Sequence, residues 1–292
     1  MTDPEQAHGA PADVTARISS LLPSLLPAER QVAQVLLDRA ADAAELSSQQ
    51  VADLAATSRA TVVRTAQSLG YSGYQQLRVL LARDALLQRQ AADSGDHGVR
   101  GVAAATFAHF HQVQDSAVQM TALLDADEVA RAVARLAAAR RILVVGHGLS
   151  RSLSVDVTAR LVRLGLQAEQ LSDRMDQLVV TRLLGPHDVV LVISGSGAHS
   201  DSLALAREAA AGEPGLIVIT AFARSAIAQL ADILLVVGMP NTSFTDELTY
   251  TTRIPQAILI EGLMGSLRDQ LGERGRRAAA LALSAVSDHV HE

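Results

Sequence analysis

The sequence of 292 residues contains no cysteine and no lysine. Without cysteine there can be no disulfide framework, no thiolate metal site and no cysteine nucleophile, which is typical of a protein of the reducing cytoplasm. Without lysine there can be no phosphate-binding lysine of the kind that a nucleoside-triphosphate-binding loop requires. We therefore expect a cytoplasmic protein that uses neither kind of chemistry.

Long apolar runs are also absent from the sequence. The longest, such as DILLVVGM at 232–239, falls well short of the roughly 18 to 20 apolar residues that a membrane-spanning helix needs. The acidic start MTDPEQ lacks the basic region and the apolar region of a signal peptide. We expect no membrane partner.

Positive charge is scarce overall but concentrated in one segment. The formal net charge is −6, which argues against a protein that coats nucleic acid with its whole surface. Residues 1–53 contain three arginines against eight acidic residues, whereas residues 54–90 contain five arginines against one acidic residue, Asp84. The arginines of the second segment are Arg59, Arg64, Arg78, Arg83 and Arg89. One basic segment therefore lies in an acidic chain.

Periodicity and turn residues divide the chain into two domains. Residues 17–90 show helical periodicity, with stops at proline and glycine and no strand pattern, and predict an all-α domain over 1–88. Residues 89–104 are polar and rich in glycine, and predict an exposed linker. A second domain is expected over 105–285, followed by a tail at 286–292.

The second domain alternates short apolar strands with helical segments. Continuous β-branched runs occur at RILVVG, DVVLVIS, GLIVIT and DILLVV, and each is followed by a turn and a helical pattern. A weaker run, QAEQLS, fits between the first two. Uninterrupted apolar strands are what a parallel sheet covered on both faces requires. The pattern predicts a doubly wound α/β domain with five parallel strands.

Residues 46–78 carry the signals of a helix-turn-helix. Ser47 and Gln50 have the spacing of a capping box, Ser58 suits the N-cap of a second helix, and Gly70 would end that helix. A turn of about three residues separates the two helices in this motif. The small or apolar residues that would let the helices cross closely are Ala52, Ala56 and Val62.

The second helix would present its N-terminal half to the DNA major groove. The side chains expected to project outward there are Arg59, Thr61, Arg64 and Gln67. The same pattern also suits an ordinary helical pair whose arginines are only solvated, but its coincidence with the basic segment favours DNA. Since readers of this type pair over two half-sites, we expect a homodimer or a tetramer on a double-stranded DNA operator.

The run ATSRATVVRTAQSLGYSGYQQLR resembles the N-terminal domain of the RpiR family of bacterial transcriptional regulators. The matching residues are Ser58, Thr61, Val62, Arg64, Leu69, Gly70, Tyr71, Gly73, Tyr74, Leu77 and Arg78. The chain departs from the family at Ala56, Thr57 and Thr65, where glycine, valine and phenylalanine are usual, and alanine suits a positive φ less well than glycine. The residues then expected to contact DNA are Ser58, Arg59, Thr61, Arg64, Gln67 and Tyr74.

Two loops that follow expected strands are rich in glycine and serine. They are GHGLS at 146–150 and SGSGAHS at 194–200, and each leads into an expected helix. Such loops meet at the carboxyl edge of an open α/β sheet, where backbone N–H groups and hydroxyls can hold an anion. A third loop adds Thr220 and the N-cap candidate Ser225. The alternative is that these residues form only turns and helix caps.

Neither glycine loop has a dinucleotide fingerprint. The first lacks a third glycine at the proper spacing, and no acidic residue follows a second strand where a ribose would need one. We expect no cofactor.

These loops and their strands are similar to the sugar isomerase (SIS) domain, a five-stranded parallel fold that binds phosphosugars. The similarity covers about 128–240, and RpiR-type regulators have the two domains in this order. It implies a sugar phosphate effector whose phosphate is held by serines, with His199 standing where the family usually has threonine. The residues expected to bind the effector are Gly146, His147, Gly148, Ser150, Ser194, Gly195, Ser196, Gly197, His199, Thr220 and Glu261.

A phosphosugar isomerase or lyase with an extra helical domain is the alternative function. Such chemistry needs a base beside the reacting sugar carbons, for which the candidates are His147, His199, Glu247 and Glu261. Glu261 could face the pocket from a helix or be an ordinary helix carboxylate. No metal site is expected, because His109 and His111 do not share a helical face. The helix-turn-helix favours a non-enzymatic repressor of carbohydrate catabolism genes, controlled by a phosphosugar.

Overall fold

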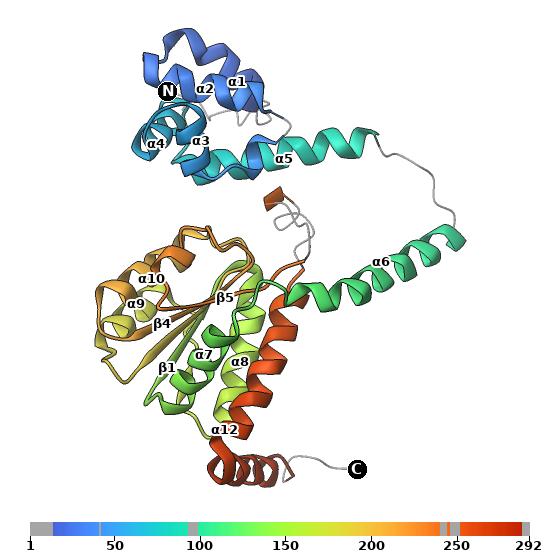
Figure 1. Ribbon diagram of the computed structural model, residues 1–292, viewed down its shortest axis with the longest axis vertical. Helices are drawn as coiled ribbons and strands as arrows, with labels where there is room; N and C mark the ends of the chain where they lie inside the picture. The colour runs from blue at the N-terminus through green and yellow to red at the C-terminus, as the bar shows by residue number, and fades with distance from the viewer. Residues whose placement is uncertain (1–13, 41, 93–98, 240–243, 246–251, 288–292) are drawn as a thin grey trace, which may run out of the picture. The chain divides into compact units, whose positions relative to one another are not determined.

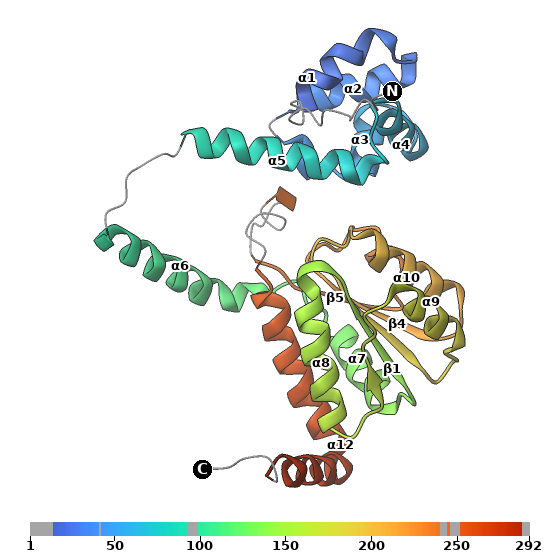
Figure 2. The ribbon, with the colours of Figure 1, turned by 180° about the vertical axis from the view of Figure 1, so that it is seen from behind.

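The computed structural model contains two compact units. The described residues are 14–40, 42–92, 99–239, 244–245 and 252–287. The first unit takes in Met1–Gly98 and Ser243–Tyr250, and the second takes in Val99–Thr242 and Thr251–Glu292. Figures 1 and 2 show the elements of both from opposite sides. The prediction of a helical region followed by an α/β region is confirmed.

Helices joined by turns make up the described part of the first unit. Its helices are α1 (Val14–Leu21), α2 (Pro27–Asp38), α3 (Ser48–Leu54), α4 (Arg59–Ser68) and α5 (Tyr74–Ala92), with 3-10 turns η1 (Leu22–Ser24) and η2 (Ala43–Glu45). Apolar residues at helical spacing form its core, in which Ile18, Leu36, Leu69 and Leu77 are fully buried.

Helices also occupy most of the predicted linker at 89–104. α5 continues to Ala92, and α6 (Val99–Met120) begins seven residues later, so that only 93–98 fall outside the described residues. Arginine, glutamine and alanine are good helix formers, and the end of α5 contains all three, so a polar composition alone did not indicate a loop there.

The second unit is built on a five-stranded parallel sheet with the strand order β2-β1-β3-β4-β5. The strands are β1 (Ile142–Gly146), β2 (Ala168–Glu169), β3 (Val189–Ile193), β4 (Gly215–Thr220) and β5 (Ile233–Val236). Every residue of β1 and β3 is buried, which explains why these strands are continuous apolar runs. The predicted doubly wound sheet is confirmed.

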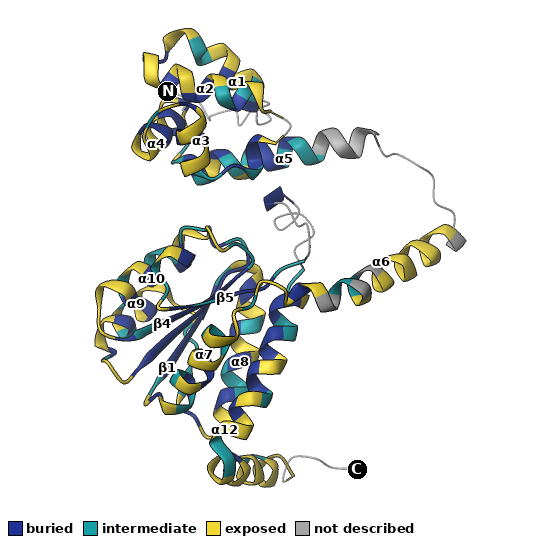
Figure 3. Cartoon of the chain, viewed as in Figure 1, coloured by how far each residue is buried: buried dark blue, intermediate teal, exposed yellow. Residues whose placement is uncertain are grey.

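Helices cover both faces of this sheet (Figure 1). α7 (Ala126–Ala138), α8 (Arg151–Arg163) and α12 (Ile254–Ser287) supply one core, and α9 (Arg174–Leu183) and α10 (Ser200–Ala211) border the other. Alternate strand residues enter the two cores: Val144 enters the first, and Val145 enters the second. Figure 3 shows the buried strands between helices whose outer surfaces are exposed.

α12 is interrupted at Gly272, where φ is +53°. None of the helices in the described part of the chain combines the length and the apolar character that crossing a bilayer requires.

Candidate functional site

α4 begins as the sequence indicated and exposes basic side chains. Ser58 is its N-cap, and the Ser58 hydroxyl oxygen accepts a hydrogen bond from the backbone N–H of Thr61 at 3.2 Å. Arg59, Arg64 and Gln67 are exposed on this helix. Guanidinium and amide groups are the side chains that hold phosphates and read base edges. α4 therefore has the surface that a DNA-reading helix needs.

The sequence analysis missed one member of this exposed face. Val63 is 38% exposed and lies four residues after Arg59 and four before Gln67, so the three form one row along α4. An exposed apolar side chain in such a row suits contact with a thymine methyl group. Helical spacing alone could have identified it.

Two residues predicted to face DNA lie elsewhere. Thr61 is 7% exposed, and its hydroxyl lies 3.0 Å from the Ser58 hydroxyl, so it supports the start of α4. Tyr74 is 3% exposed, and its hydroxyl donates to the Leu46 carbonyl at 2.8 Å. Burial raises the pKa of Tyr74. The folded unit turns the side chains of Thr61 and Tyr74 inward, so the prediction that they contact DNA gains no support from their placement.

The turn before α4 is closed at Ala56. Its φ is +50°, and the N–H of Thr57 donates to the Ala52 carbonyl at 2.8 Å, as in a Schellman helix end. Ala52 and Val62 are buried as predicted, but Ala56 is exposed. An alanine here carries the strain that glycine would avoid.

The candidate ligand site of the second unit lies at the carboxyl edge of the sheet. The strand order reverses between β1 and β3, which are neighbours in the sheet. The loop after β1 leads into α8, and the loop after β3 leads into α10. The two serine loops therefore leave adjacent strands at the topological switch point, which is where open α/β sheets bind ligands.

Three serines bring hydroxyl groups to these loops. Ser150 and Ser194 are 3% and 4% exposed, and among the described residues neither hydroxyl has a hydrogen-bond partner. Both oxygens remain accessible to solvent. Ser196 is partly exposed, and its oxygen accepts the N–H of Ala198 at 3.3 Å. Hydroxyls that the protein itself does not use are available to an anion.

Two glycines allow the loops to approach so closely. A Cβ atom at Gly146 would lie 2.5 Å from the Ser150 carbonyl oxygen, so only glycine lets β1 pass the start of α8. Gly197 has a φ of +62°, and a Cβ atom there would lie 2.4 Å from Cβ of Ser225. Any larger residue at either position would displace a serine loop.

His147 is held in one orientation beneath the site. Gln177 donates its amide N–H to the Leu171 carbonyl at 2.6 Å, which turns its oxygen toward His147 Nε2 at 3.0 Å. His147 Nε2 therefore carries the proton, and Nδ1 accepts from the Ser202 hydroxyl at 2.9 Å. Burial lowers the pKa of His147. Both ring nitrogens of this neutral imidazole are occupied, so it offers a ligand only its ring.

His199 is the histidine that the fold leaves available. Its ring stacks on that of His147, with centroids 5.1 Å apart and an interplanar angle of 10°. It is exposed at the N-cap position of α10 and makes no capping hydrogen bond. The sequence analysis missed Gln177 and Ser202, which fix this pair through His147. A buried glutamine on the apolar side of α9 was the available signal.

Two residues of the predicted ligand set have other tasks. Thr220 is fully buried, and its hydroxyl donates to the Gly195 carbonyl at 3.1 Å, so it shapes the second serine loop from beneath. Glu261 is exposed on α12, where it accepts two hydrogen bonds from Arg160 of α8, at 2.7 and 2.6 Å. The described contacts of both side chains are with other protein groups, and their binding of the ligand stays a prediction.

The remaining candidate bases and metal ligands form no further catalytic or metal site within the described residues. Glu247 lies outside the described residues. No three histidine, aspartate or glutamate side chains within the described ranges gather as a metal ion would require.

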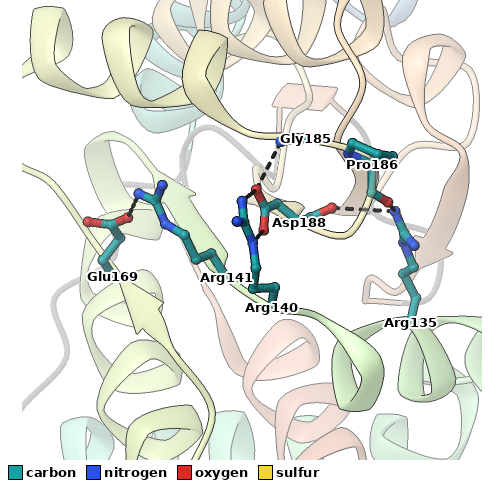
Figure 4. A network of polar contacts seen from close by, with 7 residues as sticks. All are labelled: Arg135, Arg140, Arg141, Glu169, Gly185, Pro186 and Asp188. Carbon is teal, nitrogen blue, oxygen red and sulfur yellow. Dashed lines mark hydrogen bonds and ion pairs between the residues drawn. The ribbon is translucent and has the colours of Figure 1, made fainter.

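The opposite, amino edge of the sheet carries a different polar network (Figure 4). Asp188 accepts hydrogen bonds from Arg140 at 3.0 and 2.8 Å and from the backbone N–H of Gly185 at 2.9 Å. The hydrogen bonds from Arg140 hold the pKa of Asp188 down at about 2. Arg135 donates to the Pro186 carbonyl, and Arg141 pairs with Glu169 at 2.7 Å.

A cavity of about 710 Å³ also lies at this amino edge. Its arginines already have partners: Arg131 donates to the Asp232 carbonyl at 2.9 Å, and Arg135 to the Pro186 carbonyl. This hollow is therefore a poorer anion site than the serine loops, because Arg131 and Arg135 already donate to protein carbonyls.

Comparison with known proteins assigns both regions of the chain. A helix-turn-helix domain of the rpiR family matches residues 12–86, and a SIS domain matches residues 135–260. The regulator HexR of Pseudomonas aeruginosa is 30% identical over 253 residues, covering 85% of this chain and 86% of HexR. RpiR of Escherichia coli is 27% identical over 223 residues, covering 74% and 73%. Both are HTH-type transcriptional regulators.

Solved structures show the same fold. NanR of Vibrio vulnificus, complexed with ManNAc-6P, is 24% identical to this chain, with a TM-score of 0.77 over 96% of this chain and all of that one. The sugar isomerase domain of an RpiR transcription factor from Sphaerobacter thermophilus is 21% identical, with a TM-score of 0.51 over 61% of this chain and 96% of that one.

Proposed function

Because this chain belongs to the RpiR family of helix-turn-helix transcriptional regulators, we propose that it represses genes of carbohydrate catabolism under the control of a sugar phosphate. The first unit binds a double-stranded DNA operator through α4, and the serine loops bind the effector. The protein acts in the cytoplasm, without a cofactor and without catalysing a reaction.

The serine loops are the observation that carries the effector part of this proposal. Ser150 and Ser194 offer hydroxyls without partners among the residues that the structure describes, at the switch point of the sheet and beside the N-termini of α8 and α10. Hydroxyl donors beside helix N-termini can hold the oxygens of a phosphate monoester. The proposal is further supported by NanR, which has a similar fold and was solved with ManNAc-6P.

The stacked histidines support recognition of the sugar. His147 is fixed and neutral, so it holds His199 against the loop without binding the ligand through nitrogen. His199 then presents a donor or an acceptor to a hydroxyl of the sugar. We assign to His199 the role that threonine has in similar sequences.

A homodimer or a tetramer of the chain completes the DNA-binding part. One α4 reads one half-site, so a tight operator complex needs a second copy. α6 exposes Val102, Phe107 and Phe110, of which the two aromatic side chains are 66% and 64% exposed. An apolar surface of this kind suits burial against another copy.

Selection of duplexes from a random DNA pool tests the proposal directly. The purified chain should enrich a sequence with two related half-sites, and one sugar phosphate should change its dissociation constant for that duplex by about tenfold or more. Hexose, amino-sugar, N-acetylmuramic, gluconate-type and pentose phosphates form the panel, each with its unphosphorylated parent. Failure to enrich any sequence would remove the DNA-binding part, and no response to any phosphate would remove the effector part.

Arg64→Ala provides the check on the reading helix. Loss of a phosphate or base contact should weaken binding to the enriched duplex by about 1 to 3 kcal/mol, or roughly fivefold to more than a hundredfold. Arg277→Ala is the matched control, since Arg277 is an exposed arginine of α12. Equal affinities of the two variants would show that α4 is not the reading helix.

A further inference from the structure

A short piece of the later part of the chain belongs to the helix-turn-helix unit. The first unit includes Ser243–Tyr250 besides Met1–Gly98. The structure describes two of these residues, Phe244 and Thr245, which are 1% and 3% exposed. Phe244 is the bulkiest of the fully buried side chains. A residue nearly 180 positions beyond α4 is therefore packed within the unit that contains the DNA-reading helix.

The contacts of Phe244 and Thr245 form a defined socket, which we call the Glu45–Arg78 socket. The carboxylate of Glu45 accepts the backbone N–H of Phe244 and, at 3.0 Å, that of Thr245. The Arg78 guanidinium lies over the Phe244 ring, 3.3 Å from its centroid. Hydrogen bonds to a carboxylate are stronger than neutral ones, and a cation over a desolvated ring adds to them.

The socket is itself held rigidly. Arg78 donates to the Ala44 carbonyl at 2.6 Å and to the Glu45 carbonyl at 3.1 Å, so its guanidinium joins α5 to η2. Burial lowers the pKa of Arg78 to about 10. Arg78 comes from the basic segment of the sequence, yet its donors serve the protein interior. It is therefore not part of the DNA-binding charge.

The socket adjoins the first helix of the helix-turn-helix. Glu45 ends η2, and Ser47, only two residues later, is the N-cap of α3 through its capping box with Gln50. The carbonyl of the intervening Leu46 accepts the hydroxyl of Tyr74. A displacement of Glu45 would therefore be passed to the N-cap of α3, two residues later.

Phe244 also has a defined origin in the second half of the chain. It lies between β5, which ends at Val236, and α12, which begins at Ile254. All strands of the sheet are parallel, so β5 ends at the same carboxyl edge as β1 and β3, where the serine loops lie. The chain that leaves the effector edge is thus the chain that supplies Phe244.

We propose that Phe244 and Thr245 form a latch that occupies the Glu45–Arg78 socket and transmits effector binding at the serine loops to α3 and α4. The inference rests on the proposed function. The occupant is this chain's own segment, because the socket matches it with a carboxylate for two N–H groups and a cation for one ring. A change at the carboxyl edge reaches the latch through the covalent chain, and the latch bears on the N-cap of α3.

Hydrogen exchange in the full-length protein tests whether the latch is formed. Phe244→Ala removes the ring under Arg78, and the amides of α3 should then exchange about tenfold faster or more. Leu183→Ala is the matched control, since that side chain is exposed at the end of α9. Glu45→Gln keeps the shape of the socket and weakens only its charge, so it should give a smaller change of the same kind. Unchanged exchange of α3 in Phe244→Ala would overturn the latch.

Coupling is tested with the enriched duplex and the phosphate panel of the proposed function. In the wild type, one sugar phosphate changes DNA affinity by a measured ratio. Phe244→Ala should still bind that phosphate and the duplex, while the ratio falls close to one. A full ratio in Phe244→Ala would overturn the coupling, even if exchange in α3 were faster. If no phosphate acts on the wild type, the proposed function fails and the coupling with it, while the exchange result still decides whether the latch exists.

Discussion

The two edges of the parallel sheet differ in whether their buried polar residues are hydrogen-bonded within the protein. At the amino edge, Asp188, Arg140 and Gly185 satisfy one another, and the side chain of Asp188 is fully buried. At the carboxyl edge, the hydroxyls of Ser150 and Ser194 have no partner among the described residues, although both residues are almost as buried. The polar side chains of the amino edge are paired with one another, whereas the serine hydroxyls of the carboxyl edge are available to an anion.

The difference in hydrogen bonding between the two edges indicates which edge binds a ligand. A hydroxyl that no described protein group uses but that solvent can reach, such as those of Ser150 and Ser194, can exchange its water for a ligand. A network whose members are all paired stabilises the fold and leaves nothing for a ligand. The cavity at the amino edge belongs to the second case. Donors that the described protein groups do not use therefore identify the candidate site.

The largest expected effect is on stability at the amino edge. Asp188→Ala strands the N–H of Gly185 and releases Arg140, which should lower the free energy of unfolding by about 3 kcal/mol. Urea unfolding measures this loss. The affinity for a sugar phosphate should stay the same, and a weakened affinity would break the distinction between the two edges.

The stability of the protein at low pH should show the contribution of the same carboxylate, Asp188. The hydrogen bonds from Arg140 depress the folded-state pKa of Asp188 from 3.8 to about 2. Its contribution, about 2 kcal/mol, is therefore present above pH 4 and is lost as the pH falls from about 4 to 2. Unfolding free energies measured across this range should fall less steeply in Asp188→Asn. Identical slopes in the two proteins would contradict the assignment.

At the carboxyl edge, Ser194→Ala should act on binding and not on folding. The Ser194 hydroxyl has no described protein partner, so its removal costs the fold little, whereas a hydrogen bond to a phosphate is worth about 1.5 kcal/mol or more, which is roughly tenfold in affinity. Calorimetric titration with the effector measures it. Ser266→Ala is the matched control, because Ser266 is an exposed serine of α12. A strongly destabilised Ser194→Ala would instead make this serine structural.

His199→Thr should give the smallest effect. The side chain is exposed and rests on His147 by stacking, so its loss should change the affinity for the effector by less than about tenfold and leave unfolding unaltered. Competition between two sugar phosphates that differ at one hydroxyl would sharpen the result. A shift in preference supports sugar recognition, and equal losses for both ligands assign His199 to the phosphate.

The sequence predicted the fold because its signals are local. Continuous apolar strands, the capping box at Ser47 and Gln50, and the N-cap at Ser58 each depend on neighbours within a few residues. The two serine loops were predicted for the same reason, since parallel strands place every carboxyl end at one edge.

Several predicted site residues have partners far along the chain that the sequence did not indicate. Tyr74 bonds to Leu46, 28 residues away, and Glu261 to Arg160, 101 residues away. The hydroxyl of Thr220 is used by Gly195, on the neighbouring loop. Sequence spacing indicates which interactions a side chain is capable of, but the tertiary fold determines which partner it bonds to. The burial of Phe244 in the first unit has no local signal at all.

A thermal-shift panel with three proteins tests the central claim most directly. Wild type, Asp188→Ala and Ser194→Ala are each melted with the panel of sugar phosphates and their unphosphorylated parents. A ligand at a hundred times its dissociation constant stabilises the fold by about 2.7 kcal/mol, which is readily measured. We predict that one phosphate stabilises wild type and Asp188→Ala by the same amount, that its parent does not, and that Ser194→Ala loses the effect. An undiminished shift in Ser194→Ala, or an equal shift with the parent sugar, would contradict the account.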